Sequence, residues 1–346
     1  MIRFLPLLFV FFLCDCNSSP LADQHAASES ATDPADSAIH RLEGEAMGTY
    51  YRVTYTGDSL PALQASLDSL FDAYNLELSA WVPGSKINAF NNSENGISLA
   101  NTEHFIPNLR LAREVSEQTG GAYDPTVAPL VKYWGFGTAE KRTDAAGDAA
   151  EIAQLLSLVG MDKLTLEGDF LHKKTGVTLN LNASAKGYGV DLVSRFLARR
   201  GRPDHLIDIG GEMRGGGLKY DRPWNVAIRL PDENRAKIAR AGTLPLSGGR
   251  AIATSGNYLD YYKVDGKTLS HTIDPRTGRV ERNRLLSASV LAPDCATADA
   301  YATACLVLGP EAALELINGL PELEGYFIVL AEDGEGLQTV KTNGLK

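Results

Sequence analysis

Residues 253–258 read Ala-Thr-Ser-Gly-Asn-Tyr, residues 270–278 read Ser-His-Thr-Ile-Asp-Pro-Arg-Thr-Gly, and residues 298–303 read Ala-Asp-Ala-Tyr-Ala-Thr. These three motifs place a strand end, a tight turn and the start of a helix close together along the chain. A fourth motif, at 180–191, reads Asn-Leu-Asn-Ala-Ser-Ala-Lys-Gly-Tyr-Gly-Val-Asp and leaves room beside one lysine. Together the motifs indicate a site for a phosphorylated ligand and a hard metal ion.

Apolar periodicity outside these motifs predicts helices and strands in mixed order. Helices are expected at 60–78, 106–119, 149–159, 184–200, 296–308 and 310–318. Strands are expected at 50–55, 177–181, 205–209, 225–229, 251–254, 258–264, 286–291 and 326–330, with a hairpin at 164–172. Gly160 is expected to end the third helix in the left-handed conformation. Hairpins without regular strand–helix alternation predict an α+β fold with mixed, largely antiparallel sheets and packed helices.

The charge balance limits the partners that the chain can have. Lys and Arg number 33 against 43 Asp and Glu, which gives a formal net charge of -10. An acidic chain is a poor match for the nucleic-acid backbone, so no nucleic-acid partner is expected. Any cationic site for phosphate must therefore be local.

The N-terminus is typical of an exported protein. Arg3 precedes an apolar run at 4–13, which is too short for a stable membrane span. Leu-Cys-Asp-Cys at 13–16 is similar to a lipoprotein cleavage site with Cys16 as the lipidated residue, although Asp15 departs from the small residue usual before that cysteine. A cleaved soluble signal, or lipidation at Cys14, is the alternative. We expect a signal peptide at 1–16, a flexible tether at 17–38 and a folded domain at 39–346, anchored to the membrane by lipid and facing the periplasm.

The remaining cysteines, Cys295 and Cys305, allow a disulfide bond, but Cys305 lies in an apolar helical run. A buried thiol is the commoner reason for such a cysteine, and we expect no catalytic role.

Asp299 and Thr303 are four residues apart, which places both on one face of the expected helix. A carboxylate beside a hydroxyl suits Mg²⁺, which prefers oxygen ligands. The spacing is also common by chance, because an acidic residue near a helix N-terminus is favoured by the helix dipole.

Lys186 and His271 are the candidate cationic and proton-transferring groups. Lysine near a helix start opposes the helix dipole, so a bound phosphate would explain it; a surface lysine is the alternative. His271 precedes the turn at 274–278 and could take a proton from an attacking hydroxyl, or could serve as a structural hydrogen-bonding residue. Gly-Gly-Glu at 210–212 follows a strand. Its glycines would allow the backbone to approach a ligand closely, and a tight turn is the alternative explanation for the same glycines.

Taken together, the motifs resemble the ApbE family, the FAD:protein FMN transferases of the bacterial periplasm. The resemblance covers nearly the whole chain after the tether. Besides the four motifs above it rests on Met-Gly-Thr (47–49), Leu-Ser-Ala-Trp (78–81), Ser-Lys-Ile-Asn (85–88), Tyr-Asp-Pro-Thr-Val (123–127), Tyr-Trp-Gly-Phe-Gly (133–137) and Ile-Asp-Ile-Gly-Gly-Glu (207–212).

The resemblance implies an ApbE-like fold and a role for each matched residue. It implies FAD contacts at Met47, Trp81, Ala122, Tyr123, Asp124, Asn180, Lys186 and Ile273. It also implies an Mg²⁺ site formed by the Ala183 carbonyl, Asp299 and Thr303, with His271 as catalytic base. Three positions depart from the family pattern: Trp81 where tyrosine is frequent, and Asn257 and Glu212 where aspartate is frequent.

The implied activity is Mg²⁺-dependent transfer of FMN from FAD to a Thr or Ser hydroxyl of an exported acceptor flavoprotein, such as a subunit of a membrane redox complex. An FAD pyrophosphatase, which releases FMN and AMP, would use the same site. A flavin-binding lipoprotein without turnover is the third alternative, and the presence of Lys186, His271, Asp299 and Thr303 argues against it.

Overall fold

An eight-stranded antiparallel sheet forms the centre of the fold. The computed structural model describes residues 38–137, 139–230, 240–257, 261–281 and 283–345. The strand order is β1-β2-β6-β7-β10-β15-β16-β17, with every neighbouring pair antiparallel. The strands are β1 (Ile39–Ala46), β2 (Thr49–Thr56), β6 (His205–Ile209), β7 (Glu212–Gly216), β10 (Ala251–Gly256), β15 (Leu285–Ala292), β16 (Glu324–Leu330) and β17 (Leu337–Lys341).

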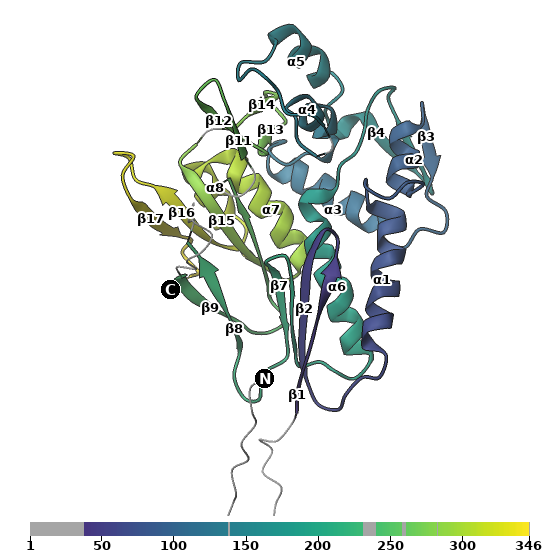
Figure 1. Cartoon of the computed structure of the whole chain (residues 1–346), viewed down its shortest axis with the longest axis vertical. Helices are drawn as coiled ribbons and strands as arrows, with labels where there is room; N and C mark the ends of the chain where they lie inside the picture. The colour runs from purple at the N-terminus through teal and green to yellow at the C-terminus, as the bar shows by residue number, and fades with distance from the viewer. Residues whose placement is uncertain (1–37, 138, 231–239, 258–260, 282, 346) are drawn as a thin grey trace, which may run out of the picture. The chain divides into compact units, whose positions relative to one another are not determined.

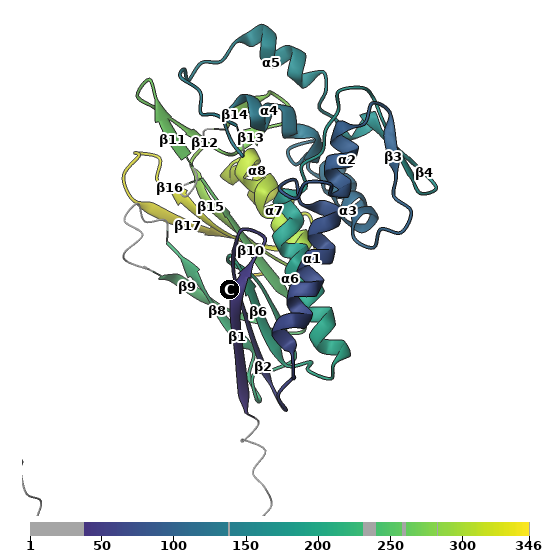
Figure 2. The same ribbon diagram turned by 45° about the vertical axis from the view of Figure 1, so that its right-hand side comes forward.

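Helices cover one face of this sheet (Figures 1 and 2). The helices are α1 (Leu63–Leu78), α2 (Lys86–Asn92), α3 (Phe105–Gln118), α4 (Ala128–Tyr133), α5 (Ala149–Leu156), α6 (Asn182–Arg199), α7 (Cys295–Leu308) and α8 (Pro310–Asn318). Helix α7 packs on β10 and β15, and α6 packs on β6, β7 and α7. Helix α7 is buried on almost every side, and its sequence is correspondingly apolar except at Thr297, Asp299 and Thr303.

Short hairpins complete the fold. The hairpin of β8 (Trp224–Arg229) and β9 (Arg240–Leu246) packs an apolar face against Ile252, Leu291, Tyr326 and Ile328 of the sheet. The other small sheets are β3 (Gly96–Ser98), β5 (Phe170–Lys173) and β4 (Leu164–Glu167); β11 (Tyr261–Val264) with β12 (Lys267–Ser270); and β13 (Ile273–Asp274) with β14 (Arg279–Val280). Single 3₁₀ turns lie at Pro125–Val127 and Met161–Lys163. The expected α+β fold with largely antiparallel sheets is confirmed.

Three expected elements differ from the structure: helix α1 begins at Leu63 and not at Leu60, the strand expected at 177–181 is absent, and helix α5 ends early. Residues 177–181 form no strand, because the Asn91 side chain pairs with the Leu179 backbone, donating to its carbonyl at 3.0 Å and accepting from its N–H at 2.7 Å. Helix α5 ends at Leu156, three residues before the expected end, where the Ser157 hydroxyl donates to the Gln154 carbonyl. Gly160 has φ 140° and ψ 127°, outside the left-handed helical region, so it does not cap the helix. Of the strand expected at 258–264, residues 258–260 lie outside the described residues.

Cys295 and Cys305 are buried free thiols at the start and in the last turns of the same helix. Ten residues of α-helix separate them by about 15 Å, which is too far for a disulfide bond. The expectation of a buried thiol is therefore confirmed.

The N-terminus of α7 is fixed to the middle of α6 by buried polar contacts. Asp191 of α6 accepts the backbone N–H groups of Cys295 and Ala296 at 3.0 Å each, and also pairs with Arg214. Asp294 caps α7 by accepting the Thr297 N–H at 2.9 Å. The first turn of α7 is thus held against α6 by a carboxylate that satisfies otherwise unpaired helix donors.

Gly187 is a position of close approach between the two helices. A Cβ atom there would lie 2.2 Å from the Cys295 carbonyl oxygen. Gly187→Ala is therefore expected to lower the free energy of unfolding by about 1–3 kcal/mol, because backbone cannot yield as a flexible side chain can. Urea unfolding measures this. Gly242→Ala is the control, since its Cβ would meet only the Tyr326 hydroxyl at 3.6 Å; equal stability of the two variants would contradict the close approach.

Candidate active site

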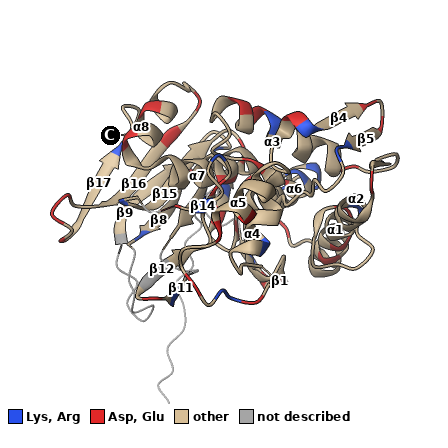
Figure 3. Cartoon of the chain, turned by 90° about the horizontal axis from the view of Figure 1, so that it is seen from above, with Lys and Arg blue, Asp and Glu red and all other residues tan. Residues whose placement is uncertain are grey.

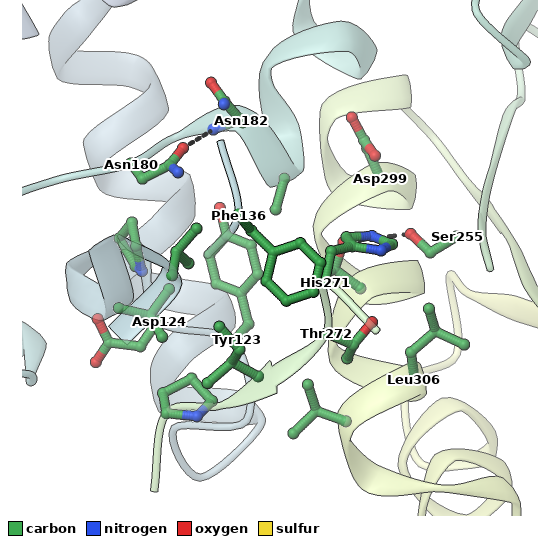
Figure 4. Close-up of a pocket in the computed structure, with 18 of the residues that line it drawn as sticks. Tyr123, Asp124, Phe136, Asn180, Asn182, Ser255, His271, Thr272, Asp299 and Leu306 are labelled. Atoms are coloured by element: carbon green, nitrogen blue, oxygen red, sulfur yellow. Dashed lines mark hydrogen bonds between the residues drawn. The ribbon is translucent and has the colours of Figure 1, made fainter. Parts of the chain in front are cut away.

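A cavity of about 510 Å³ opens where four segments that are distant in the sequence meet. Its walls come from the start of α6, the end of β10, one side of α7 from Asp299 to Val307, and the loop that leads from β12 into β13 (Figure 4). The segment at 122–127 and the ring of Phe136 close another side. The volume is in the range of small-molecule sites.

All of the residues predicted for the site line this cavity, with the exception of Met47. The lining includes Trp81, Ala122, Tyr123, Asp124, Asn180, Ala183, Lys186, His271, Ile273, Asp299 and Thr303. Met47 lies in the turn between β1 and β2, with φ 54°, and its side chain packs against the core around α6. A Cβ atom on Gly189 would lie 2.7 Å from the Met47 sulfur, so the small residues of α6 make room for Met47 and α7.

Lys186 carries the positive charge in the cavity wall. Its Nζ lies 3.3 Å from Glu212 Oε1, and a third of its side chain is exposed. The charge of Asp299, followed by that of Glu212, holds the Lys186 pKa above its usual range, so the ammonium form is favoured. Burial raises the pKa of both carboxyl groups, and Lys186 opposes this effect at each. The lysine is thus a permanent cation suited to an anionic ligand.

Asp299, Thr303 and the Ala183 carbonyl form an oxygen-rich corner. The buried Asp299 carboxylate accepts a hydrogen bond from the Gly187 N–H at 3.0 Å. In a regular α-helix this N–H would donate to the Ala183 carbonyl. Thr303 Oγ1 lies 3.3 Å from Ser255 Oγ of β10. Carboxylate, hydroxyl and carbonyl oxygens are the donors that Mg²⁺ prefers, so this corner fits a hard cation. Among the described residues, no group of three or more His, Cys, Asp or Glu side chains could hold a metal.

His271 stands at the cavity side of the loop between β12 and β13. It is exposed, its ring meets Phe136 edge to face at 6.5 Å between centroids, and it is directed toward Ser255 (Figure 4). The nearby Asp274 is buried and held by Arg276, whose Nε and Nη2 each donate at 2.9 Å. Asp274 is therefore engaged in a bidentate ion pair, whereas His271 faces the cavity.

The opposite wall is aromatic and polar. Tyr123 is buried and donates to Ser184 Oγ at 3.2 Å, and burial raises its pKa. Asp124 accepts from the Thr126 N–H at 2.8 Å and from its hydroxyl at 2.6 Å. Asn180 Oδ1 accepts the Asn182 N–H at 3.0 Å and so starts α6. Trp81 is 61% exposed at the rim, where its ring is available for stacking on a ligand.

The cavity also contains residues that the sequence alone did not assign to it. They are Pro125, Val127, Val131, Phe136, Gly137, Asn182, Gly210, Glu212, Thr254, Ser255, Gly256, Thr272, Pro275, Leu306 and Val307. Glu212 and Ser255 belong to motifs that the sequence singles out. Val131, Leu306 and Val307 lie outside these motifs and give no such signal, because the sequence pattern of an apolar helical residue is the same in a core and in a cavity wall.

Comparisons with known proteins identify the family of this chain. A family model described as the ApbE family matches residues 47–327. The chain is 35% identical over 302 residues to the FAD:protein FMN transferase of Vibrio cholerae, which covers 85% of this chain and 88% of the relative. It is 33% identical over 322 residues to that of Klebsiella pneumoniae, with 90% of each chain covered.

Solved structures show the same fold. The flavin transferase ApbE from Vibrio cholerae superposes with a TM-score of 0.77 at 32% identity, covering 89% of this chain and 98% of that one. The apo form of the Pseudomonas stutzeri flavinyl transferase ApbE gives a TM-score of 0.78 at 29% identity, covering 89% and 95%.

Proposed function

The chain belongs to the ApbE family, and from this premise we propose that it transfers FMN from FAD to a Thr or Ser hydroxyl of an exported acceptor protein, with Mg²⁺ as cofactor. In this reaction the acceptor oxygen bonds to the FMN phosphorus, the pyrophosphate bond breaks and AMP leaves. The observation that carries the proposal is the convergence of Lys186, Asp299, Thr303 and His271 on one cavity.

Each of these residues has a task that its surroundings support. Lys186 would bind the pyrophosphate, because its ammonium is held in the charged form beside two carboxylates. His271 would take the proton of the acceptor hydroxyl as general base. Trp81 would stack on an aromatic ring of FAD.

Ala183, Asp299 and Thr303 would hold the Mg²⁺ ion. When bound, the ion would supply positive charge to offset the negative charge of the phosphates. Asp299 brings the only formal charge of this set, and the oxygen-only character of the corner supports the choice of a hard cation over zinc.

The test is incubation with FAD, Mg²⁺ and an acceptor protein that carries an Asp-Ser/Thr-Gly-Ala-Ser/Thr motif. In-gel flavin fluorescence of the denatured acceptor reports covalent attachment, and an acceptor with alanine at the modified hydroxyl is the control. Release of FMN and AMP without labelling would indicate an FAD pyrophosphatase instead. FAD binding without any turnover would indicate a flavin-binding protein.

The acidic surface fits a protein acceptor and not a nucleic acid. Lys and Arg residues are interspersed with Asp and Glu residues along many elements of the chain (Figure 3), and the formal net charge is -10. Lys186 lines the cavity, so its positive charge is close to a ligand bound there and does not form part of an extended basic surface.

The proposed location is the periplasmic side of a membrane, with a lipid anchor at Cys16. Residues 1–37, which include the expected signal and cysteine, lie outside the described residues. In the part of the chain that the structure describes, none of the helices has the length and apolar character that a membrane span requires.

Cys16→Ala is expected to move the protein from the membrane fraction to the soluble fraction, because it removes the proposed site of lipidation. Fractionation of cells that express either form measures this, and Cys14→Ala is the matched control. A wild type that is already soluble would favour a cleaved signal, and release by Cys14→Ala alone would assign the lipid to Cys14.

A further inference from the structure

Glu212 is a buried cavity carboxylate to which the reaction above gives no role. It is the first residue of β7, follows Gly210 and Gly211, and is only 3% exposed. Its Oε1 contacts Lys186 Nζ at 3.3 Å, while its Oε2 is buried with no hydrogen-bond partner. A buried carboxylate with an unpaired oxygen costs stability, so the fold alone gives no reason for it.

Lys186 interacts electrostatically with two buried carboxylates, Glu212 and Asp299, but within the described residues it forms an ion pair with Glu212 alone. Asp299 is nevertheless the stronger electrostatic influence on Lys186. The Asp299 carboxylate instead accepts the Gly187 N–H at 3.0 Å. Without Glu212, the ammonium group would have Asp299 as its remaining anionic partner.

We propose that Glu212 is a positioning residue that holds the Lys186 ammonium away from Asp299, so that the Asp299 carboxylate stays available to a divalent cation. The inference rests on the proposed function in taking Asp299 as a metal ligand. An ammonium group and a divalent cation compete for the same carboxylate, because both are attracted by its negative charge. When one of them is bound, the other is attracted less strongly. Glu212 removes this competition by offering the lysine its own partner.

The first test measures cation binding without FAD. Mn²⁺ serves as the probe, because it accepts the same oxygen ligands as Mg²⁺ and its free form is measured by electron paramagnetic resonance. Glu212→Gln keeps the size of the side chain and an acceptor oxygen but removes the charge. We expect Mn²⁺ affinity to fall by about 10- to 100-fold, the range for losing a group that orients a metal ligand. The thermal midpoint should change little, because the substitution removes the charge on the unpaired Oε2 while an acceptor oxygen remains for Lys186.

The second test separates an action through Lys186 from a direct attraction between Glu212 and the cation. In a Lys186→Met background the competing ammonium is absent, so Glu212→Gln should change Mn²⁺ affinity little. Asp124→Asn is the matched control, because it removes a carboxylate from the same cavity that makes no ion pair with Lys186; its Mn²⁺ affinity should equal that of the wild type.

The outcomes are distinct. An equal loss of affinity in both backgrounds would mean that Glu212 attracts the cation directly, which overturns the inference. Unchanged affinity in Glu212→Gln, or a wild type that binds no Mn²⁺, also overturns it. FMN transfer by the wild type, measured separately on the acceptor, decides the proposed function independently of these results.

Discussion

Asp299→Asn is expected to lower FMN transfer by about 10³-fold or more. Asp299 carries the only formal charge in the proposed metal corner, and charge stabilisation by a bound metal is worth several kcal/mol of the barrier, with about 1.4 kcal/mol for each factor of ten. Asparagine retains an oxygen that can accept the Gly187 N–H, the contact that Asp299 makes at 3.0 Å. The fold should therefore survive, whereas Asp299→Ala would lose both the charge and the helix contact.

The assay compares initial rates of acceptor labelling across a range of Mg²⁺ concentrations. Asp294→Asn is the matched control, since it lies on the same helix and caps it through the Thr297 N–H, and asparagine caps a helix as well as aspartate does. The control should keep the wild-type rate. If Asp299→Asn also kept that rate at limiting Mg²⁺, Asp299 would not be a metal ligand.

His271→Ala is expected to lower the rate of FMN transfer by about 10²- to 10⁴-fold, the usual contribution of a general base, with little change in FAD affinity. The ring is exposed at the cavity wall and packs edge to face on Phe136, so truncation leaves the buried core intact. Labelling of the acceptor over time measures the rate, and an FAD titration of the same preparation measures affinity.

His172→Ala is the control, because its ring lies on β5, outside the cavity lining, and is half-exposed. It should leave both quantities unchanged. Should FAD affinity fall in step with the rate in His271→Ala, His271 would be a binding or structural residue. The base would then have to be another group. Asp274 is a poor replacement because Arg276 holds its carboxylate through two contacts.

The regular elements of the fold follow from local patterns. The apolar spacing that predicts helices at 184–200 and 296–308 is confirmed by α6 and α7, since amphipathic or fully apolar runs are stabilised by burying that surface. The strand at 205–209 and the hairpin at 164–172 are confirmed for the same reason. The edge strands β1 and β17 were not predicted, because neither contains a fully buried residue and their apolar alternation is therefore weak.

Local patterns fail where a distant group replaces a local one. Residues 177–181 have a strand-like composition, but a side-chain amide from α2 satisfies the Leu179 backbone in place of a neighbouring strand. The small residues at 183–189 were expected to leave space for a ligand. At Gly187 that space is occupied by the backbone of α7, and at Gly189 by Met47.

The sequence by itself determined the family, the fold class and most of the candidate site, because the residues that carry the chemistry lie in compact motifs whose order along the chain is specific. Only the tertiary structure decided how these motifs share one cavity. It showed that Asp299 accepts a donor from α6, that Lys186 pairs with Glu212, and that Met47 lies outside the lining. Those contacts join residues up to 112 positions apart, and spacing along a chain carries no information on which distant side chains meet when a core is packed.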